Sequence, residues 1–113
     1  MVLDDYSFDM ANPLTAGRRT IRVENVAEQP HEVFVVRLAP GKTLQDMLDW
    51  AAIENGPPPG APIAGTTAIA KSGVNYVIAD FAPGEYALIC FIPDAHDGKP
   101  HVMHGMARQI TVR

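Results

Sequence analysis

The side chains best suited to metal chemistry gather in one short stretch of this sequence. Residues 90–106, CFIPDAHDGKPHVMHGM, hold the chain's single cysteine, three of its four histidines and two of its five methionines. Thiolate, imidazole and thioether groups are ligands for soft and borderline metal ions. A loop that only reverses the chain has no need of them, so this stretch predicts a metal site.

The remaining histidine lies far upstream and completes a ligand set. His31 follows Pro30 at the start of an apolar run, where a neighbouring strand could present an imidazole. With Cys90, His101 and Met106 it offers two imidazoles, one thiolate and one thioether. A trigonal His₂Cys set with a weak axial Met favours copper that cycles between Cu(II) and Cu(I), whereas zinc usually binds Cys and His without a thioether. The predicted ion is therefore copper.

Short β-strands are predicted to position these ligands. Ten prolines and nine glycines divide the chain into segments of strand length. Strand alternation places Tyr86, Leu88 and Cys90 on one face, so Cys90 ends its strand where the ligand-rich loop begins. The predicted strands cover residues 2–10, 20–25, 31–38, 75–81, 85–91 and 108–112.

One segment has the period of a helix instead. The motif TLQD at residues 43–46 matches a helix-capping signature, apolar residues follow at helical spacing up to Ala51, and Asn55-Gly56 supplies a stop. The next segment, GPPPGAP at residues 56–62, predicts a stiff extended connector that is neither helix nor central strand. Together these patterns predict an antiparallel sandwich or barrel with one helix in a long crossover.

The composition fits one domain, residues 1–113, and excludes several functions. A net charge of −4 leaves no basic surface for nucleic acid. No apolar run approaches the roughly 18 residues of a membrane span, and the first residues lack a signal-peptide pattern, so we expect a soluble chain. A single cysteine does not settle the redox compartment. No nucleophile–base set, phosphate loop or paired carboxylates appear, so an enzyme is not predicted.

Two of these patterns resemble the cupredoxins, the single-domain blue copper proteins. In that family the first ligand histidine follows a proline a few residues after an asparagine, as His31 follows Asn25 and Pro30 here. The ligand cysteine of the family ends the penultimate strand after a Gly-x-Tyr pattern, as Cys90 does after residues 84–86.

A third pattern, near the C-terminal end of the chain, also resembles the cupredoxins. The second histidine and the methionine of the family are separated by four residues, with a glycine before the methionine and a short strand after it. His101, Gly105-Met106 and the strand at residues 110–112 match this arrangement. The stretch HVMHGM is especially similar to the type 1 site of copper nitrite reductases.

The resemblance implies a fold, a cofactor and an activity. The expected fold is an all-β Greek-key β-sandwich with one short helix in a crossover connection. The expected cofactor is one type 1 copper ion, with His31, Cys90 and His101 in its equatorial plane and Met106 axial. The expected function is one-electron transfer with a redox protein partner, in the periplasm or the extracellular space.

Two departures from the family keep alternatives open. Ten residues separate Cys90 from His101, more than in the small blue proteins, and a helix with a proline-rich crossover follows the third strand. The long loop leaves His96 and His104 as rival ligands. It also motivates a metal-free cupredoxin-like interaction domain, in which these side chains serve structure. A third hypothesis is copper storage or delivery, with exposed His96, Met103 and His104 as the route for the ion.

Overall fold

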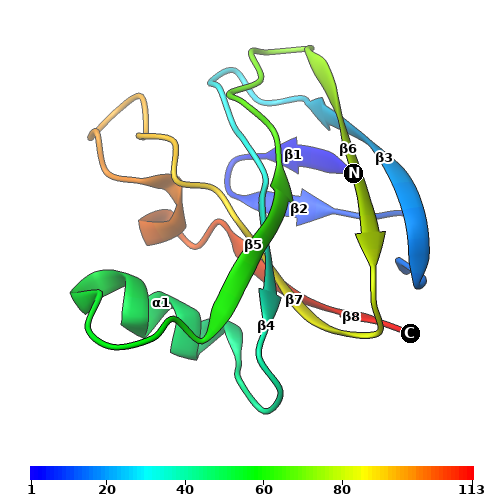
Figure 1. Cartoon of the computed structure of the whole chain (residues 1–113). Coiled ribbons are helices and arrows are strands. Elements are labelled where there is room, and N and C mark those ends of the chain that lie inside the picture. The colour runs from blue at the N-terminus through cyan, green and yellow to red at the C-terminus, as the bar shows by residue number, and fades with distance from the viewer.

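The computed structural model describes all 113 residues and shows two four-stranded β-sheets packed face to face (Figure 1). The first sheet, in the order β2-β1-β3-β6, contains β1 (Val2–Asp4), β2 (Ser7–Asp9), β3 (Gly17–Asn25) and β6 (Val74–Phe81). The second, in the order β5-β4-β7-β8, contains β4 (Phe34–Leu38), β5 (Gly60–Gly65), β7 (Gly84–Ile89) and β8 (Ala107–Val112). Helix α1 (Leu44–Ile53) lies in the crossover between β4 and β5, and a 3₁₀ helix, η1 (His101–His104), precedes β8. The predicted all-β sandwich with one helix in a crossover is confirmed.

The inner faces of the two sheets form the main core. Leu3, Val23 and Val77 of the first sheet and Val35 and Leu88 of the second are all buried there. Removing apolar side chains of this size from water is worth about 1.5–3 kcal/mol each, so this layer holds the sheets together. The same layer extends to the end of the sandwich where the predicted ligands lie.

Strand β7 is buried on both faces and aims Cys90 into the core. Tyr86 and Leu88 belong to the main core together with Cys90, which follows the strand. The intervening Ala87 and Ile89 face the other way, into a smaller cluster beneath α1. The predicted alternation is therefore confirmed, and it places the thiol inside the sandwich.

Helix α1 begins and ends as its sequence predicts. Thr43 caps it: its side chain accepts from the Asp46 N–H, and the Asp46 carboxylate accepts from the Thr43 N–H at 2.9 Å. The helix ends at Ile53, and Glu54 then takes the left-handed conformation with φ of 54°. Met47 is buried against the outer face of the second sheet. No helix of the protein is long and apolar enough to cross a membrane.

The N-terminal segment departs from the prediction. Residues 2–10 form a hairpin, β1 and β2, instead of one strand, with the turn at Asp5-Tyr6. Leu3 and Phe8 are separated by an odd number of positions, so a single straight strand would point them to opposite faces. The hairpin pairs Leu3 with Phe8 and buries both, which brings the turn to the end of the sandwich.

Two further boundaries differ in the second sheet. The strand predicted from His31 begins only at Phe34, and His31 forms an isolated bridge with Ile69, because β5 ends at Gly65 and leaves no ladder partner. The proline-rich connector is shorter than predicted, since residues 60–65 pair with β4 as an edge strand. Pro62 fits there because an edge position leaves one side of the backbone unpaired.

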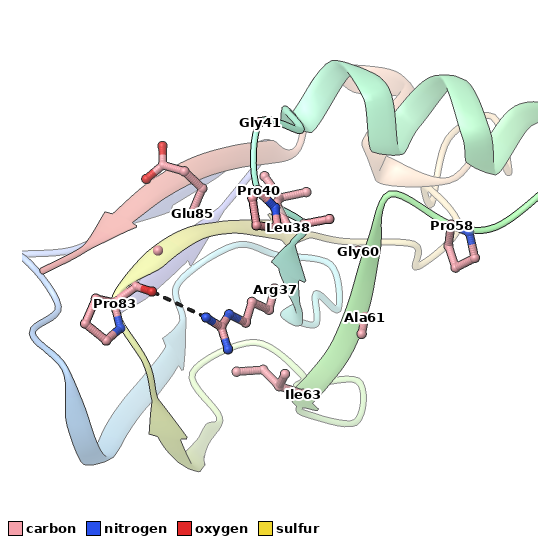
Figure 2. A pocket seen from close by; sticks show the side chains of 12 residues that line it. Arg37, Leu38, Pro40, Gly41, Pro58, Gly60, Ala61, Ile63, Pro83 and Glu85 are labelled. Atoms are coloured by element: carbon pink, nitrogen blue, oxygen red, sulfur yellow. Dashed lines mark hydrogen bonds between the residues drawn. The ribbon is translucent and has the colours of Figure 1, made fainter.

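A hollow of about 660 Å³ lies at the far end of the second sheet (Figure 2). Arg37 projects beside it and donates to the Pro83 carbonyl at 3.5 Å. Arg37 pairs with Tyr86, whereas Phe34 pairs with Ile89 next to Cys90, so this hollow is remote from the predicted ligands. It plays no part in the site described below.

Candidate metal centre

Three separate segments bring His31, Cys90 and His101 together inside the protein. His31 precedes β4, Cys90 follows β7 and His101 begins η1. All three residues are fully buried. The two imidazole Nδ1 atoms lie 3.0 Å apart, and the Cys90 Sγ atom lies 3.9 Å from Nδ1 of His31 and 3.5 Å from Nδ1 of His101.

These three distances define a site of metal-ion size. A triangle with sides of 3.0, 3.5 and 3.9 Å has its centre about 2.0 Å from every corner. Metal–imidazole bonds are about 2.0–2.1 Å and metal–thiolate bonds about 2.3 Å. An ion near that centre would therefore reach all three donor atoms with little movement of the chain.

The tautomer of His31 follows from its outer hydrogen bond. Its Nε2 atom lies 2.6 Å from Oδ1 of Asp5, at the tip of the β1–β2 hairpin. A carboxylate only accepts hydrogen bonds, so Nε2 carries the proton and donates it. In the neutral ring, Nδ1 then has a bare lone pair directed at the other donors.

The tautomer of His101 is fixed in the same way by an amide. Its Nε2 lies 2.9 Å from Oε1 of Gln29. The orientation of this amide follows from its partners: its nitrogen donates to Oδ1 of Asp5 and of Asp94, both at 3.0 Å, and its oxygen accepts from the Ala95 N–H at 2.8 Å. The oxygen therefore accepts from His101 Nε2–H, and Nδ1 of His101 is also bare.

Two bare nitrogen lone pairs and a sulfur atom thus face a common point. Lone pairs 3.0 Å apart repel each other unless a proton or a metal cation lies between them. Burial lowers the pKa of His101, and the neighbouring His31 lowers it further, so a protonated imidazole is disfavoured. The donor set and its tautomers fit a bound metal cation.

Cys90 is held as a ligand would be. Its Sγ atom accepts a hydrogen bond from the Glu32 N–H at 3.4 Å, a contact typical of an anionic sulfur. Burial raises the pKa of the Cys90 thiol, so the free side chain keeps its proton. A cation at the centre reverses this preference, because the thiolate is the form that binds metal.

Backbone hydrogen bonds hold Met106 next to Cys90 and His101. It is fully buried and belongs to the same apolar cluster as Cys90. Its N–H donates to the His101 carbonyl at 3.1 Å, and its carbonyl accepts from the Cys90 N–H at 3.2 Å. Gly105, with φ of 91°, makes the sharp turn between η1 and Met106, a conformation that other residues rarely adopt.

The two rival histidines lie outside this cluster. His96 and His104 are both exposed, and His104 bonds Asp97 at 2.8 Å between Nε2 and Oδ2. Neither histidine forms part of the buried triangle, and His104 gathers instead with Asp94 and Asp97 in a separate group. The fold therefore separates the histidines that the sequence alone left as competitors.

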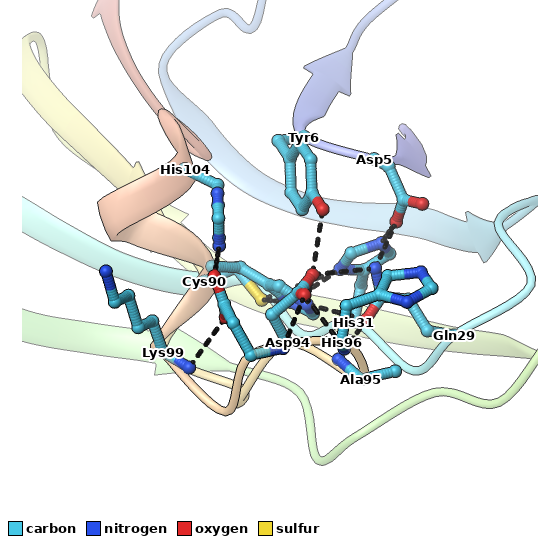
Figure 3. A network of polar contacts seen from close by, with 12 residues as sticks. Asp5, Tyr6, Gln29, His31, Cys90, Asp94, Ala95, His96, Lys99 and His104 are labelled. Atoms are coloured by element: carbon cyan, nitrogen blue, oxygen red, sulfur yellow. Dashed lines mark hydrogen bonds and ion pairs between the residues drawn. The ribbon is translucent and has the colours of Figure 1, made fainter.

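A polar layer covers the outer side of the two buried imidazoles (Figure 3). The Tyr6 hydroxyl donates to Oδ1 of Asp94 at 2.8 Å, and its ring stacks on His104 with centroids 4.9 Å apart. The same ring lies 5.6 Å from that of His101. Although burial alone raises the pKa of Asp94, hydrogen bonds from Tyr6 and Gln29 hold it far below its ordinary value, so Asp94 is ionised.

Sequence reasoning missed this polar layer. Its members, Asp5, Tyr6, Gln29 and Asp94, follow no motif and are spread over 90 residues of sequence. The one weak signal is that Gln29 directly precedes Pro30-His31. A mostly apolar hollow of about 650 Å³ lies near the site as well, and its lining includes Phe91, which follows Cys90, and Met103 of η1.

The two-sheet sandwich with its crossover helix has the cupredoxin fold, and the buried His-Cys-His cluster lies at one end of it. A solved structure of dithionite-reduced auracyanin from the photosynthetic bacterium Roseiflexus castenholzii, a cupredoxin, is similar to this chain. The likeness covers 97% of this chain and 90% of auracyanin, with a TM-score of 0.60 and 24% sequence identity, and it describes the fold. No protein-family profile and no curated protein matches the sequence.

Proposed function

We propose that this protein binds one copper ion in a type 1 site and carries single electrons. His31, Cys90 and His101 would hold the ion, with Met106 as a fourth and weaker ligand. The observation that carries this proposal is the triangle of donor atoms, whose centre lies about 2.0 Å from each. Bound copper would supply the change between Cu(II) and Cu(I).

Rigidity of the ligands supports electron transfer in particular. Both imidazoles are anchored through Nε2, and the Cys90 and Met106 backbones are joined by a hydrogen bond. Ligands held in this way move little when an ion changes its charge, so electron exchange requires little rearrangement. The burial of all four side chains leaves no exposed position for a substrate, which supports a carrier over an enzyme.

Copper titration followed by visible and electron paramagnetic resonance spectroscopy tests this proposal. One equivalent of Cu(II) should produce an intense thiolate-to-copper absorption band. Cys90→Ala should abolish the band, because the thiolate is its source. A colourless protein whose copper affinity is unchanged by Cys90→Ala would refute the type 1 assignment.

Two matched pairs of variants test the individual ligands. Met106→Leu should change the spectrum and raise the reduction potential, because an apolar side chain then replaces the thioether, while Met103→Leu should change neither. Met103 is 67% exposed and lies three residues away, so it controls for loss of a nearby methionine. His101→Ala should abolish the type 1 spectrum, whereas His104→Ala should preserve it. Equal effects within either pair would contradict the ligand assignment.

Burial also separates this proposal from copper storage or delivery. A delivery site exchanges its ion readily, which requires accessible donors, yet all of the proposed donors are buried here. We therefore propose slow exchange of Cu(I) with a chelator and fast exchange of electrons. A redox protein is the proposed partner, and a periplasmic or extracellular location is proposed to accompany this activity.

A further inference from the structure

Gln29 makes hydrogen bonds with every polar group of its side chain. Its Nε2 atom donates to Asp5 and to Asp94, and its Oε1 atom accepts from the Ala95 N–H and from Nε2–H of His101. The residue itself is 7% exposed. One amide thus joins the N-terminal hairpin, the loop after Cys90 and the buried imidazole of His101. Figure 3 shows Gln29 beside Asp5 and Asp94.

This position gives Gln29 control over one ring. A neutral imidazole presents Nδ1 as a ligand only when Nε2 carries the proton, and the Gln29 oxygen is the acceptor nearest to His101 Nε2. The other polar atom near that nitrogen, Oδ1 of Asp94, is 3.4 Å away and already accepts from Tyr6. Without Gln29, the His101 ring loses its best-placed acceptor.

The same residue closes the site. His101 is fully buried although Met103 and His104 of the same helix η1 are exposed, because Gln29, Tyr6 and Asp94 cover the outer edge of its ring. Small anions and imidazole have no exposed ring edge along which to approach. A shorter side chain at position 29 would leave a gap above His101.

We propose that Gln29 is a positioning residue of the metal centre, which locks His101 in the Nε2–H tautomer and closes the centre to external ligands. Only the second part of this inference, the closure of the copper centre to external ligands, rests on the proposed function. The tautomer and the protection of His101 Nε2–H are properties of the metal-free chain as well. The lock can therefore be tested whether or not copper binds.

Three variants separate the two parts of this role. Gln29→Met keeps the length of the side chain but removes its hydrogen bonds, and Gln29→Ala removes both. Gln45→Met is the control, because Gln45 is exposed on α1 and bonds only Asp49. Circular dichroism and thermal unfolding identify any variant that fails to fold.

The first measurement is the ¹H–¹⁵N spectrum of the imidazoles in metal-free protein at mildly alkaline pH. We expect a slowly exchanging Nε2–H signal from His101, and exchange faster by about tenfold or more in Gln29→Met. The Nε2–H of His31, bonded to Asp5, and both signals in Gln45→Met should stay protected. Exchange of His101 Nε2–H in the wild type as fast as in a free imidazole would overturn the lock, even if every variant at position 29 misfolds.

The second measurement adds azide or imidazole to copper-loaded protein. The charge-transfer band should stay constant in the wild type and in Gln29→Met, and shift with ligand concentration in Gln29→Ala. A shift in the wild type overturns the closure while the type 1 assignment stands. Absence of the band from the wild type overturns the type 1 assignment, and the imidazole spectra then decide the lock alone.

Discussion

Replacing Asp5 with Asn should raise the reduction potential of a bound copper ion. The Asp5 carboxylate accepts from His31 Nε2–H at 2.6 Å. An Asn side chain can accept the same hydrogen bond through its oxygen, so the tautomer of His31 is preserved while one negative charge is removed. Two neutral imidazoles, a thiolate and Cu(II) have a net charge of +1, and the Cu(I) form has none. The carboxylate therefore stabilises the oxidised state.

The size of this effect follows from distance and exposure. The 2.6 Å hydrogen bond, the width of the ring and a metal–nitrogen bond of about 2.0 Å place the carboxylate about 6.5 Å from the ion. At an effective dielectric constant of about 20, unit charges at that separation interact by about 2.5 kcal/mol. The side chain of Asp5 is 39% exposed, so screening by solvent reduces this value toward about 1 kcal/mol. The expected rise for a one-electron couple is therefore about 40 to 110 mV.

Redox titration of the copper-loaded protein, monitored at the charge-transfer band, measures this rise. Asp9→Asn is the matched control, because it removes the same charge from the same hairpin at the end opposite the turn. It should change the potential much less. If Asp5→Asn leaves the potential unchanged or lowers it, or if Asp9→Asn raises it equally, the electrostatic reasoning is wrong.

Two further predictions concern stability and are measured by urea unfolding. Leu88→Ala should lower the free energy of unfolding by about 2–5 kcal/mol, because Leu88 is buried between the sheets, while Ile53→Ala, at a side chain that is 76% exposed, should cost below about 0.5 kcal/mol. A hydrogen bond from the Thr43 backbone, then one from its side chain, lowers the pKa of Asp46. A carboxyl with a lowered pKa stabilises the fold above its unfolded pKa and loses that contribution as pH falls toward its folded pKa. The wild type should therefore have a higher free energy of unfolding than Asp46→Asn above about pH 4, and the difference should shrink as the pH falls below that value. A difference that does not depend on pH would contradict this account.

The sequence predicted those features that depend on local pattern. Alternation placed Cys90 on the core side of its strand, and the TLQD motif placed the start of α1, because both signals act over a few residues. The hairpin at Asp5-Tyr6 was missed because the run of residues 2–10 was also compatible with one continuous strand. Only the pairing of Leu3 with Phe8 shows which arrangement buries both side chains.

The surroundings of the predicted ligands depend on contacts between distant segments instead. Sequence spacing identified His31 and His101 as candidate ligands but left open whether the fold brings their rings together. Their meeting depends on the bridge between His31 and Ile69 and on the turn of η1. Their outer partners, Asp5 and Gln29, lie on segments that meet the imidazoles only in the folded state. An aspartate at a turn and a glutamine before a proline are common in any loop, so the place of Gln29 before Pro30-His31 is too weak a signal to identify it, and Asp5 has none.

The outer partners also argue for a metal centre over a metal-free interaction domain. Histidines that serve structure alone would gain most by donating at one ring nitrogen and accepting at the other. Here both rings donate outward, so in their neutral forms they turn bare nitrogens toward each other at 3.0 Å. Asp5 and Asp94 also place negative charge beside the two buried imidazoles. Buried arrangements of this kind are destabilising unless a positive charge compensates them. A cation bound by His31, Cys90 and His101 would pair with the two Nδ1 atoms and balance the charge of the two carboxylates at once, which a purely structural role would not do.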